Sequence, residues 1–495
     1  MKIQITALLA ISFLFSCSSK SELELPLIDN IALEKSMLKV EILAENLDVP
    51  WDLEYADDGF LWFNEQGGKI SRINLETGEI QELLTIYEVW RKRTAGLLGL
   101  AVHPDFVNNP YILVNYTVMM DSVISNKLVR YTFENEALIS PQVLLEIPGN
   151  TAHNGSRIKF AKDGKILWAT GDAYGFDNAQ SDTSLNGKIL RINLDGSIPK
   201  DNPNPESYVW AKGFRNIQGL TLDSQGRIFT SEHGDAIEDE INLIEKSGNY
   251  GWPAIEGFHD LEEEKEFAKK NNTIEPVYSW TPVVAPAGLD FYGDLPIEEW
   301  RNSLLLTTLK GKSLRVLKLS EDGKSIINET VFFENHYGRL RDVAVSTSGD
   351  IYIATSNHDW NPQPGFPLDG DDKILKISLT KSASQEPLTG TSPKTEIELD
   401  GKQLYSNYCA SCHKEDGTGV KEVFPSLIDN QTVLGNQEQL IKIMLSGIEN
   451  KENGQMMPSF SFMKDEQLAA ILTFIRQEWG NTSSAISPNT IKEKR

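Results

Sequence analysis

The sequence is poor in cysteine and in basic residues, and both shortages narrow what the protein can do. It has three cysteines in 495 residues, which excludes a scaffold held by several disulfides. Lys and Arg number 47 against 71 Asp and Glu, giving a formal net charge of −24. A nucleic-acid partner is not expected, because such proteins present a basic surface to phosphates. An anionic cofactor would need a local group of cations, held against this overall field.

Long apolar runs are missing beyond the N-terminus, so no membrane-spanning segment is expected there. One apolar stretch, residues 5–15, follows Lys2 and leads to Ser16 and Cys17. A basic start, a short apolar core and a small residue before the cleavage point are typical of an export signal. Residues 1–17 resemble a lipoprotein signal peptide with its lipobox, in which Cys17 becomes the acylated first residue. The alternative is a simple signal peptide with an incidental cysteine. We expect an exported protein, periplasmic or anchored to the outer membrane by lipid on Cys17.

The other two cysteines form the run Cys409-Ala410-Ser411-Cys412-His413, which matches the attachment motif of c-type haem. Two thiols one helical turn apart can bond the two vinyl groups of haem, and the adjacent imidazole can bind its iron. A thioredoxin-type motif would need a βαβ pattern, and a zinc site would need a second pair of ligands downstream; neither is visible. We therefore expect Cys409 and Cys412 to hold haem c covalently and His413 to bind the iron.

Helical periodicity surrounds this motif at residues 401–408, 438–445 and 466–478. Residues 397–482 resemble a class I cytochrome c, a family in which a Met before a Pro commonly supplies the sixth ligand. The resemblance implies Met457 as that ligand, while Met444 and Met463 are interpreted as core packing. A thioether ligand raises the haem potential, which suits an electron acceptor. The polar segment 381–396 is the expected linker before this domain, and residues 483–495 are expected to form a polar tail.

Between residues 40 and 380 one theme occurs six times: a short strand, a turn with Gly or Asp, and an alternating strand. Residues 60–63 followed by 69–74 are one copy, and residues 351–354 followed by 373–377 are another. A unit of about 50 residues of this kind cannot bury its own face, so a closed ring is the stable arrangement. The sequence predicts an all-β six-bladed β-propeller followed by a small all-α cytochrome c domain, with residues 18–39 as a tether.

Four motifs in the propeller occur in an order that resembles the soluble pyrroloquinoline quinone (PQQ) glucose and sorbosone dehydrogenase family. They lie at residues 97–106, 153–157, 213–219, and 239–242 with 248–253. The resemblance covers nearly all of the propeller. It implies PQQ-dependent oxidation of an aldose or related sugar to its lactone or acid.

PQQ carries three carboxylates and a reactive quinone, so its site needs several fixed cations. The resemblance implies that Asn216 adds a neutral hydrogen bond and that four cations face the cofactor: Arg215, Lys310, Arg339 and Arg341. It also implies that His153 is the general base, taking the proton of the anomeric hydroxyl while hydride moves to the quinone. Arg215 would stabilise the negative charge that develops there. His103 is interpreted as structural.

The same family uses Ca²⁺ to polarise the quinone. Gly234 and Asp235 match positions that contribute to that calcium, and Glu240 and Tyr250 match positions near a second, structural calcium. The acidic run at residues 369–372 is interpreted as a turn rather than a further calcium loop.

Two positions depart from the family. Residues 94–95 are Thr and Ala where an amide side chain is expected, and Ala152 replaces an acid before His153. The sugar contacts therefore differ from those of the glucose enzyme. The fused haem would pass electrons one at a time to a quinone, a cytochrome or an oxidase. The alternative is a haem-bearing binding or sensory propeller without dehydrogenase activity. A lactone hydrolase would need a set of metal ligands in the channel, and haem d1 propellers have eight blades.

Overall fold

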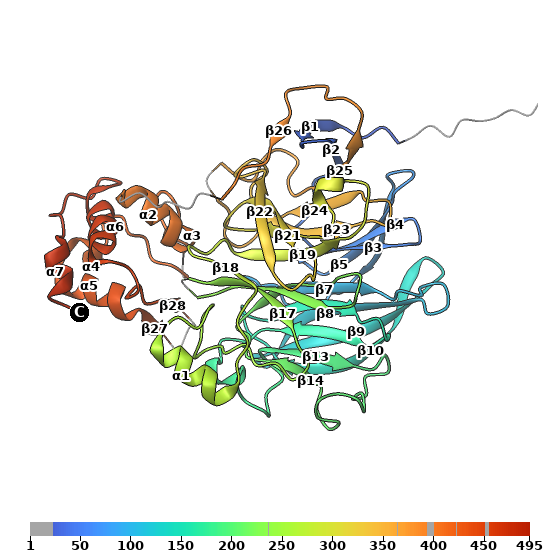
Figure 1. The fold of residues 1–495 in the computed structure, drawn as a ribbon, viewed down its shortest axis with the longest axis horizontal. Coiled ribbons are helices and arrows are strands. Elements are labelled where there is room, and N and C mark those ends of the chain that lie inside the picture. The colour runs from blue at the N-terminus through green and yellow to red at the C-terminus, as the bar shows by residue number, and fades with distance from the viewer. Residues whose placement is uncertain (1–22, 236, 364, 394–399, 422, 451–454) are drawn as a thin grey trace, which may run out of the picture.

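The computed structural model describes residues 23–235, 237–363, 365–393, 400–421, 423–450 and 455–495. In these residues six sheets, antiparallel except for one outer pair, follow one another around a ring. A small helical domain follows the last sheet and lies to one side of the propeller (Figure 1). The predicted combination of an all-β propeller and an all-α C-terminal domain is confirmed.

Five blades are each built from four consecutive strands. The first comprises β3 (Pro50–Ala56), β4 (Phe60–Glu65), β5 (Lys69–Asn74) and β6 (Ile80–Thr85). The second comprises β7 (Leu97–Val102), β8 (Tyr111–Met120), β9 (Val123–Glu134) and β10 (Ala137–Pro148), and the third β11 (Gly155–Phe160), β12 (Ile166–Thr170), β13 (Lys188–Ile192) and β14 (Val209–Lys212). The fourth comprises β15 (Ile217–Leu222), β16 (Ile228–Glu232), β17 (Asp239–Ile244) and β18 (Tyr278–Trp280), and the fifth β19 (Pro286–Tyr292), β20 (Ser303–Thr308), β21 (Ser313–Leu319) and β22 (Ile326–Phe332).

The sixth blade closes the ring with a strand from the N-terminal end of the chain. Strands β23 (Leu340–Val345), β24 (Ile351–Thr355) and β25 (Ile374–Thr380) are completed by β2 (Met37–Ala44), which pairs antiparallel with β25. Beyond β2, the sheet continues with β1 (Leu27–Ala32) and β26 (Leu388–Thr389). The predicted tether 18–39 therefore contains propeller strands, and the predicted linker 381–396 contains β26. The open edge of β25 and the buried side chains of β2 explain this pairing.

Neighbouring blades are joined by apolar packing between the sheets, and buried ion pairs near the channel join blades that are not neighbours. Arg157 of β11 bridges Asp52 of β3 at 2.6 Å and Asp342 of β23 at 2.9 Å. All three side chains are buried, so each charge has the partner that burial requires. Asp342 also accepts a hydrogen bond from the main-chain N–H of Leu53 at 2.6 Å. These contacts hold the inner strands of three blades in register.

The C-terminal domain packs its helices around one apolar core. Its elements are α2 (Gly401–Tyr408), α3 (Ala410–His413), α4 (Gln431–Leu434), α5 (Gln437–Ser446), the hairpin β27 (Ile448–Asn450) and β28 (Gln455–Met457), α6 (Asp465–Gln477) and α7 (Pro488–Lys492). Elsewhere, α1 (Glu262–Asn271) and two short 3-10 helices, Phe176–Asn178 and Glu298–Trp300, lie between strands.

The three predicted helices correspond to α2, α5 and α6. The predicted polar tail instead folds onto the domain, because Ile486 and Ile491 are buried in its core and Ser487 caps α7. No helix in the described part of the chain is long and apolar enough to cross a bilayer.

Candidate active site

Four of the predicted site residues lie on loops at one end of the channel. His153, Arg215 and Arg339 each lie within two residues of an innermost strand, β11, β15 and β23 respectively. Lys310 follows β20, whose Thr308 pairs with Pro286 at the start of the innermost strand β19. Because the innermost strands all begin at the same end of the channel, the fold brings these four residues to one opening.

His153 forms a buried pair with Asp172. Its Nδ1 lies 2.9 Å from Asp172 Oδ1, and its ring packs on Tyr174 with centroids 4.1 Å apart. The backbone of His153 has a φ of +57°, so the loop holds the ring in an uncommon conformation. With Nδ1 bonded to a carboxylate, the proton is fixed on that nitrogen and Nε2 is left as the basic atom.

Asp172 was not identified from the sequence. Its carboxylate also accepts hydrogen bonds from the N–H of Tyr174 at 2.8 Å and from Trp252 Nε1 at 2.9 Å. Burial alone would raise the pKa of Asp172, but the charge and hydrogen bond of His153 lower it below its ordinary value. The signal in the sequence is an acid two residues after the buried strand β12, at the end that faces the opening.

Burial is the main reason why the pKa of His153 is lowered below 6.5, and the positive charge of Arg215 adds to it. The charge of Asp172 acts in the opposite direction and raises the pKa. His153 is therefore neutral at neutral pH and able to accept a proton.

For the sugar oxidation that the sequence predicts, we expect the midpoint of the acid limb, where His153 becomes protonated, to lie below pH 6.5. In an Asp172→Asn variant the carboxylate that raises this pKa is lost, so the acid limb moves to lower pH. The turnover number falls at least about tenfold, since the imidazole loses its orienting partner. The measurement is kcat/KM against pH with a small soluble dye as acceptor. An acid limb that moves to higher pH in the variant would contradict this assignment.

Arg215 lies beside the same pair. Its Nη2 contacts Asp235 Oδ1 at 2.7 Å, and its guanidinium lies 5.3 Å from the ring centroid of Trp252. Its Nε is buried and has no hydrogen-bond partner in the described structure. Asn216, the next residue, accepts hydrogen bonds from the N–H of Gly155 and from Gln218 Nε2, both at 3.2 Å.

Arg339 and Arg341 share a single carboxylate. Arg339 donates from Nε at 2.8 Å and from Nη2 at 2.6 Å to Asp359 Oδ2, while Arg341 Nη2 lies 3.9 Å from the same oxygen. Burial lowers the pKa of Arg341 to about 10, and its Nε also lacks a partner in the described structure. One carboxylate does not balance two buried guanidiniums, so an anion placed here would be stabilised.

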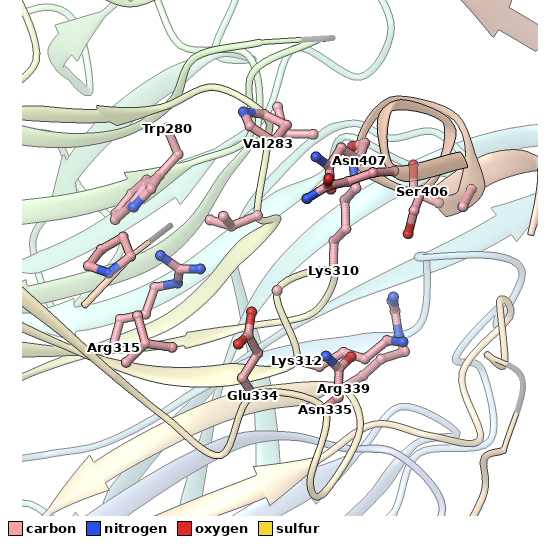
Figure 2. A pocket seen from close by; sticks show the side chains of 18 of the residues that line it. Trp280, Val283, Lys310, Lys312, Arg315, Glu334, Asn335, Arg339, Ser406 and Asn407 are labelled. Carbon is pink, nitrogen blue, oxygen red and sulfur yellow. The ribbon is translucent and has the colours of Figure 1, made fainter. Parts of the chain in front are cut away.

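Lys310 lies where the propeller meets the helical domain. Its Nζ donates to the main-chain carbonyl of Asn407, and burial lowers its pKa. Lys310, Lys312 and Arg339 line a cavity of about 330 Å³ whose other wall is formed by α2 and α3. Figure 2 shows Lys310 reaching from the propeller towards Asn407. His153, Arg215 and Arg341 do not line this cavity.

These residues fit a polyanionic cofactor. Two buried Nε donors lack acceptors, two arginines share one acid, and Lys310 is held by a neutral carbonyl. A flat molecule with several carboxylates would supply the missing acceptors. In a chain with a net charge of −24, such a concentration of buried cations is a local feature that needs an anion to balance it.

Four residues implied as calcium-binding lie near the same opening. Gly234, Glu240 and Tyr250 line a small cavity of about 10 Å³ next to Arg215, whereas Asp235 is paired with Arg215. Both carboxylate oxygens of Glu240 accept hydrogen bonds, from Gly257 N–H at 2.6 Å and Asn242 at 2.9 Å. The hydroxyl of Tyr250 donates to the Leu243 carbonyl at 2.7 Å.

Burial raises the pKa of Glu240 to about 7 and that of Glu256, which lines the same cavity, to about 8. Glu238 also lines it, and its Oε2 is buried without a partner. A cavity of this size has room for one cation or one water. The raised pKa values of its carboxyl groups fit a site where a cation would stabilise the ionised form. Among the described residues, however, no three metal-ligating side chains form a ready-made cluster. Calcium therefore stays a prediction.

Two other segments have structural roles. The ring of His103 packs against Phe160 with centroids 4.9 Å apart, and its Nδ1 accepts the N–H of Asp105 at 3.1 Å. In the acidic run, Asp371 accepts from Asn357 Nδ2 at 2.8 Å, and the Asp372 carboxylate accepts from the Asn357 N–H. Both acids are used to fix a turn, as predicted.

The haem motif lies on α3. Cys409, the residue before α3, is buried, and Cys412 within the helix is half-buried. His413 Nδ1 lies 2.9 Å from the carbonyl of Pro425, an arrangement that fixes the proton on Nδ1 and leaves Nε2 to bind iron. Met457 ends β28 and packs, half-buried, against the core of the domain. The His413 contact fits an axial haem ligand, and Met457 as the sixth ligand stays a prediction.

Next to the first departure from the family, at residues 94–95, lies an amide side chain that the sequence analysis did not identify. Gln66 Nε2 donates to the carbonyls of Arg93 and Ala95, each at 3.1 Å, and its buried Oε1 lacks a partner in the described structure. Ala152, before His153, is buried. The sequence signal for Gln66 is an amide directly after a buried strand, β4.

Comparison with known proteins gives two matches along the chain. A family model described as glucose / sorbosone dehydrogenase matches residues 47–361, and one described as cytochrome c matches residues 399–479. Quinoprotein glucose dehydrogenase B of Acinetobacter calcoaceticus is 30% identical over 404 residues, covering 64% of this chain and 84% of that protein. Cytochrome c-552 of Thermus thermophilus is 33% identical over 109 residues, covering 19% of this chain and 82% of that protein.

Among solved structures, the PQQ-bound form of an aldose sugar dehydrogenase from Streptomyces coelicolor superposes with a TM-score of 0.61 at 31% identity. It covers 69% of this chain and 98% of that chain. The family match spans the blade loops that carry His153, Arg215, Lys310, Arg339 and Arg341. The chain therefore belongs to the glucose/sorbosone dehydrogenase family and carries a cytochrome c domain at its C-terminal end.

Proposed function

We propose that the protein is a PQQ-dependent sugar dehydrogenase. It oxidises an aldose or related sugar to its lactone or acid, and passes the electrons through its own c-type haem to a respiratory acceptor. The observation that carries this proposal is the buried His153–Asp172 pair beside arginines whose Nε donors have no acceptor. A base and an anion-binding group thus lie side by side, and the cytochrome c domain contacts the propeller at Lys310, another of the implied cofactor ligands.

The residues divide the chemistry between them. His153 takes the proton of the anomeric hydroxyl at Nε2, and Asp172 stabilises the imidazolium that results. When bound, PQQ supplies the acceptor for the hydride that leaves the sugar carbon. The Arg215 guanidinium, 2.7 Å from Asp235 and beside the base, would stabilise the negative charge that develops on the cofactor.

The cofactor's carboxylates would be held by Arg339, Arg341 and Lys310, with Asn216 contributing a neutral hydrogen bond. Arg339 is oriented by its two hydrogen bonds to Asp359, so its position does not depend on the ligand. The low exposure of Arg215, Arg339 and Arg341, each under a tenth, strengthens their interaction with an anion.

Calcium binding gives a separate prediction. We expect a chelator to reduce dye-linked sugar oxidation and to lower the Tm, and added Ca²⁺ to restore both. At Ca²⁺ concentrations of 100 times Kd the stabilisation is about 2.7 kcal/mol. Glu240→Gln should weaken the calcium effect, and Glu206→Gln on an exposed loop is the matched control. An unchanged Tm and unchanged activity after chelation would show that no calcium is bound.

Export and lipidation are part of the proposal. Cys17 and the rest of the signal-like segment lie outside the described residues. Haem c and a respiratory acceptor both suit a protein that works outside the cytoplasm. Labelling with a radioactive fatty acid, compared between the natural chain and a Cys17→Ser variant, tests the lipid anchor.

The experiment that tests the activity is reconstitution of purified apoprotein with PQQ and Ca²⁺, followed by dye reduction over a panel of aldoses. PQQ-dependent turnover with at least one aldose supports the proposal. Haem-bearing protein that binds no PQQ and oxidises no sugar would favour a binding or sensory propeller.

A further inference from the structure

One short loop of the propeller contacts the haem-attachment helix, beside the contact that Lys310 makes with Asn407. Asn361, on the loop between β24 and β25, is buried and donates from Nδ2 to the main-chain carbonyl of Ser411 at 2.5 Å. Ser411 lies between the two haem-binding cysteines of α3, and its carbonyl carbon is bonded to the nitrogen of Cys412. This contact therefore holds the turn of the cytochrome c domain that carries the haem.

The same loop also holds the cofactor-binding end of the propeller. Asp359 Oδ2 accepts both hydrogen bonds from Arg339, and its Oδ1 accepts the main-chain N–H of Asn361 at 2.9 Å. Hydrogen bonds and covalent bonds thus run without a break from Arg339 through Asp359 and Asn361 to Ser411 and Cys412. The hydrogen bonds between Arg339 and Asp359, at the start of this path, are charge-assisted and therefore short and strong.

An aromatic contact supports the loop on its other side. Trp360 packs against Phe424 of the cytochrome c domain with ring centroids 6.0 Å apart, and the Arg93 guanidinium lies 5.2 Å from the Trp360 ring. Phe424 in turn lies 6.4 Å from the ring of His413, the expected iron ligand. Both residues that follow Asp359 therefore contact the haem-binding side of the cytochrome c domain.

We propose that the segment Asp359–Asn361 docks the cytochrome c domain on the propeller and is the route by which electrons pass to the haem. This rests on the proposed function. Oxidation of the sugar to a lactone releases two electrons and two protons. Each electron reduces one ferric haem to ferrous, and a one-electron acceptor outside the protein reoxidises it before the second follows. Asn361 and Trp360 are positioning residues, since they act through the helix and not on the sugar.

The test compares Asn361→Ala and Trp360→Leu with the natural chain, and Asn328→Ala on the exposed strand β22 is the matched control. Haem reduction after mixing with sugar is followed by stopped flow in protein loaded with PQQ. We expect Asn361→Ala to slow it about tenfold, because the buried Ser411 carbonyl loses its donor. Dye-linked sugar oxidation should be unchanged, measured with a dye that also works on haem-free protein. Haem reduction at the natural rate in both variants would overturn the proposal.

A second measurement needs neither sugar nor PQQ, and so separates this proposal from the proposed function. Hydrogen exchange is measured on the haem-bearing protein without PQQ. Asn361→Ala should increase the exchange of the amides of α3 several-fold, and Asn328→Ala should leave it unchanged. Unaltered exchange in Asn361→Ala would overturn the docking role even if the protein oxidised no sugar.

Discussion

A His153→Gln variant is expected to lose sugar oxidation by about 10²–10⁴-fold in kcat, because the proton of the anomeric hydroxyl no longer has an acceptor. Glutamine retains the size of the side chain and can still hydrogen-bond to Asp172, so the loop should keep its shape. The KM for sugar should change much less than kcat. The measurement is steady-state dye reduction with protein reconstituted with PQQ.

The matched control for this variant is His336→Gln. That side chain is 42% exposed and contacts Asp29 on the far side of the sixth blade, so its replacement should leave kcat unchanged. The haem spectrum of both variants should equal that of the natural chain. A His153→Gln protein that retains more than about half of the natural kcat would show that His153 is not the base, since general-base catalysis contributes much more than that.

Replacing both haem-binding cysteines, in Cys409→Ser/Cys412→Ser, is expected to abolish covalent haem altogether. The two thioether bonds need both sulfurs, and no other cysteine exists beyond Cys17. The check is peroxidase staining of haem after denaturing electrophoresis, which detects only covalently bound haem. Dye-linked sugar oxidation should survive if the dye takes electrons from the propeller.

The variant Ser411→Ala is the control, because its hydroxyl is not needed for attachment and its main-chain carbonyl still accepts from Asn361. It should stain as strongly as the natural chain. Haem staining that persisted in the double cysteine variant would contradict the attachment assigned to α3.

Local patterns were enough to predict the blades and the helices. The alternation in residues 69–74 became β5, and the periodicity at residues 401–408 became α2 with the same bounds. Pairing between distant segments was not predicted. The strand β2 joins β25 at least 330 residues along the chain, and the first residues of β2 lie in the predicted tether 18–39. The tail was similarly misread, because its burial depends on Ile486 and Ile491 meeting the core of the domain.

In the candidate site, too, local sequence predicts some features, and others arise only from contacts in the folded chain. Residues that carry charge or a reactive group, such as His153 and Arg215, could be named from the motifs in which they stand. Their partners could not, because Asp172 and Asp359 act through contacts that only the folded loops create. The predicted Lys310 is brought to the opening, but its partner in the described structure is a carbonyl of the cytochrome c domain. No local sequence pattern predicts that contact between the two domains.

The most direct test of the central claim is sugar-dependent reduction of the haem in the purified full chain, followed at the cytochrome α-band. The measurement is made with PQQ and Ca²⁺ together, with each alone, and with neither. We predict that the haem is reduced when sugar, PQQ and Ca²⁺ are all present, at a rate independent of protein concentration, because the electrons pass within one molecule. Haem that stays oxidised with all three present, across a broad panel of aldoses, would contradict the account.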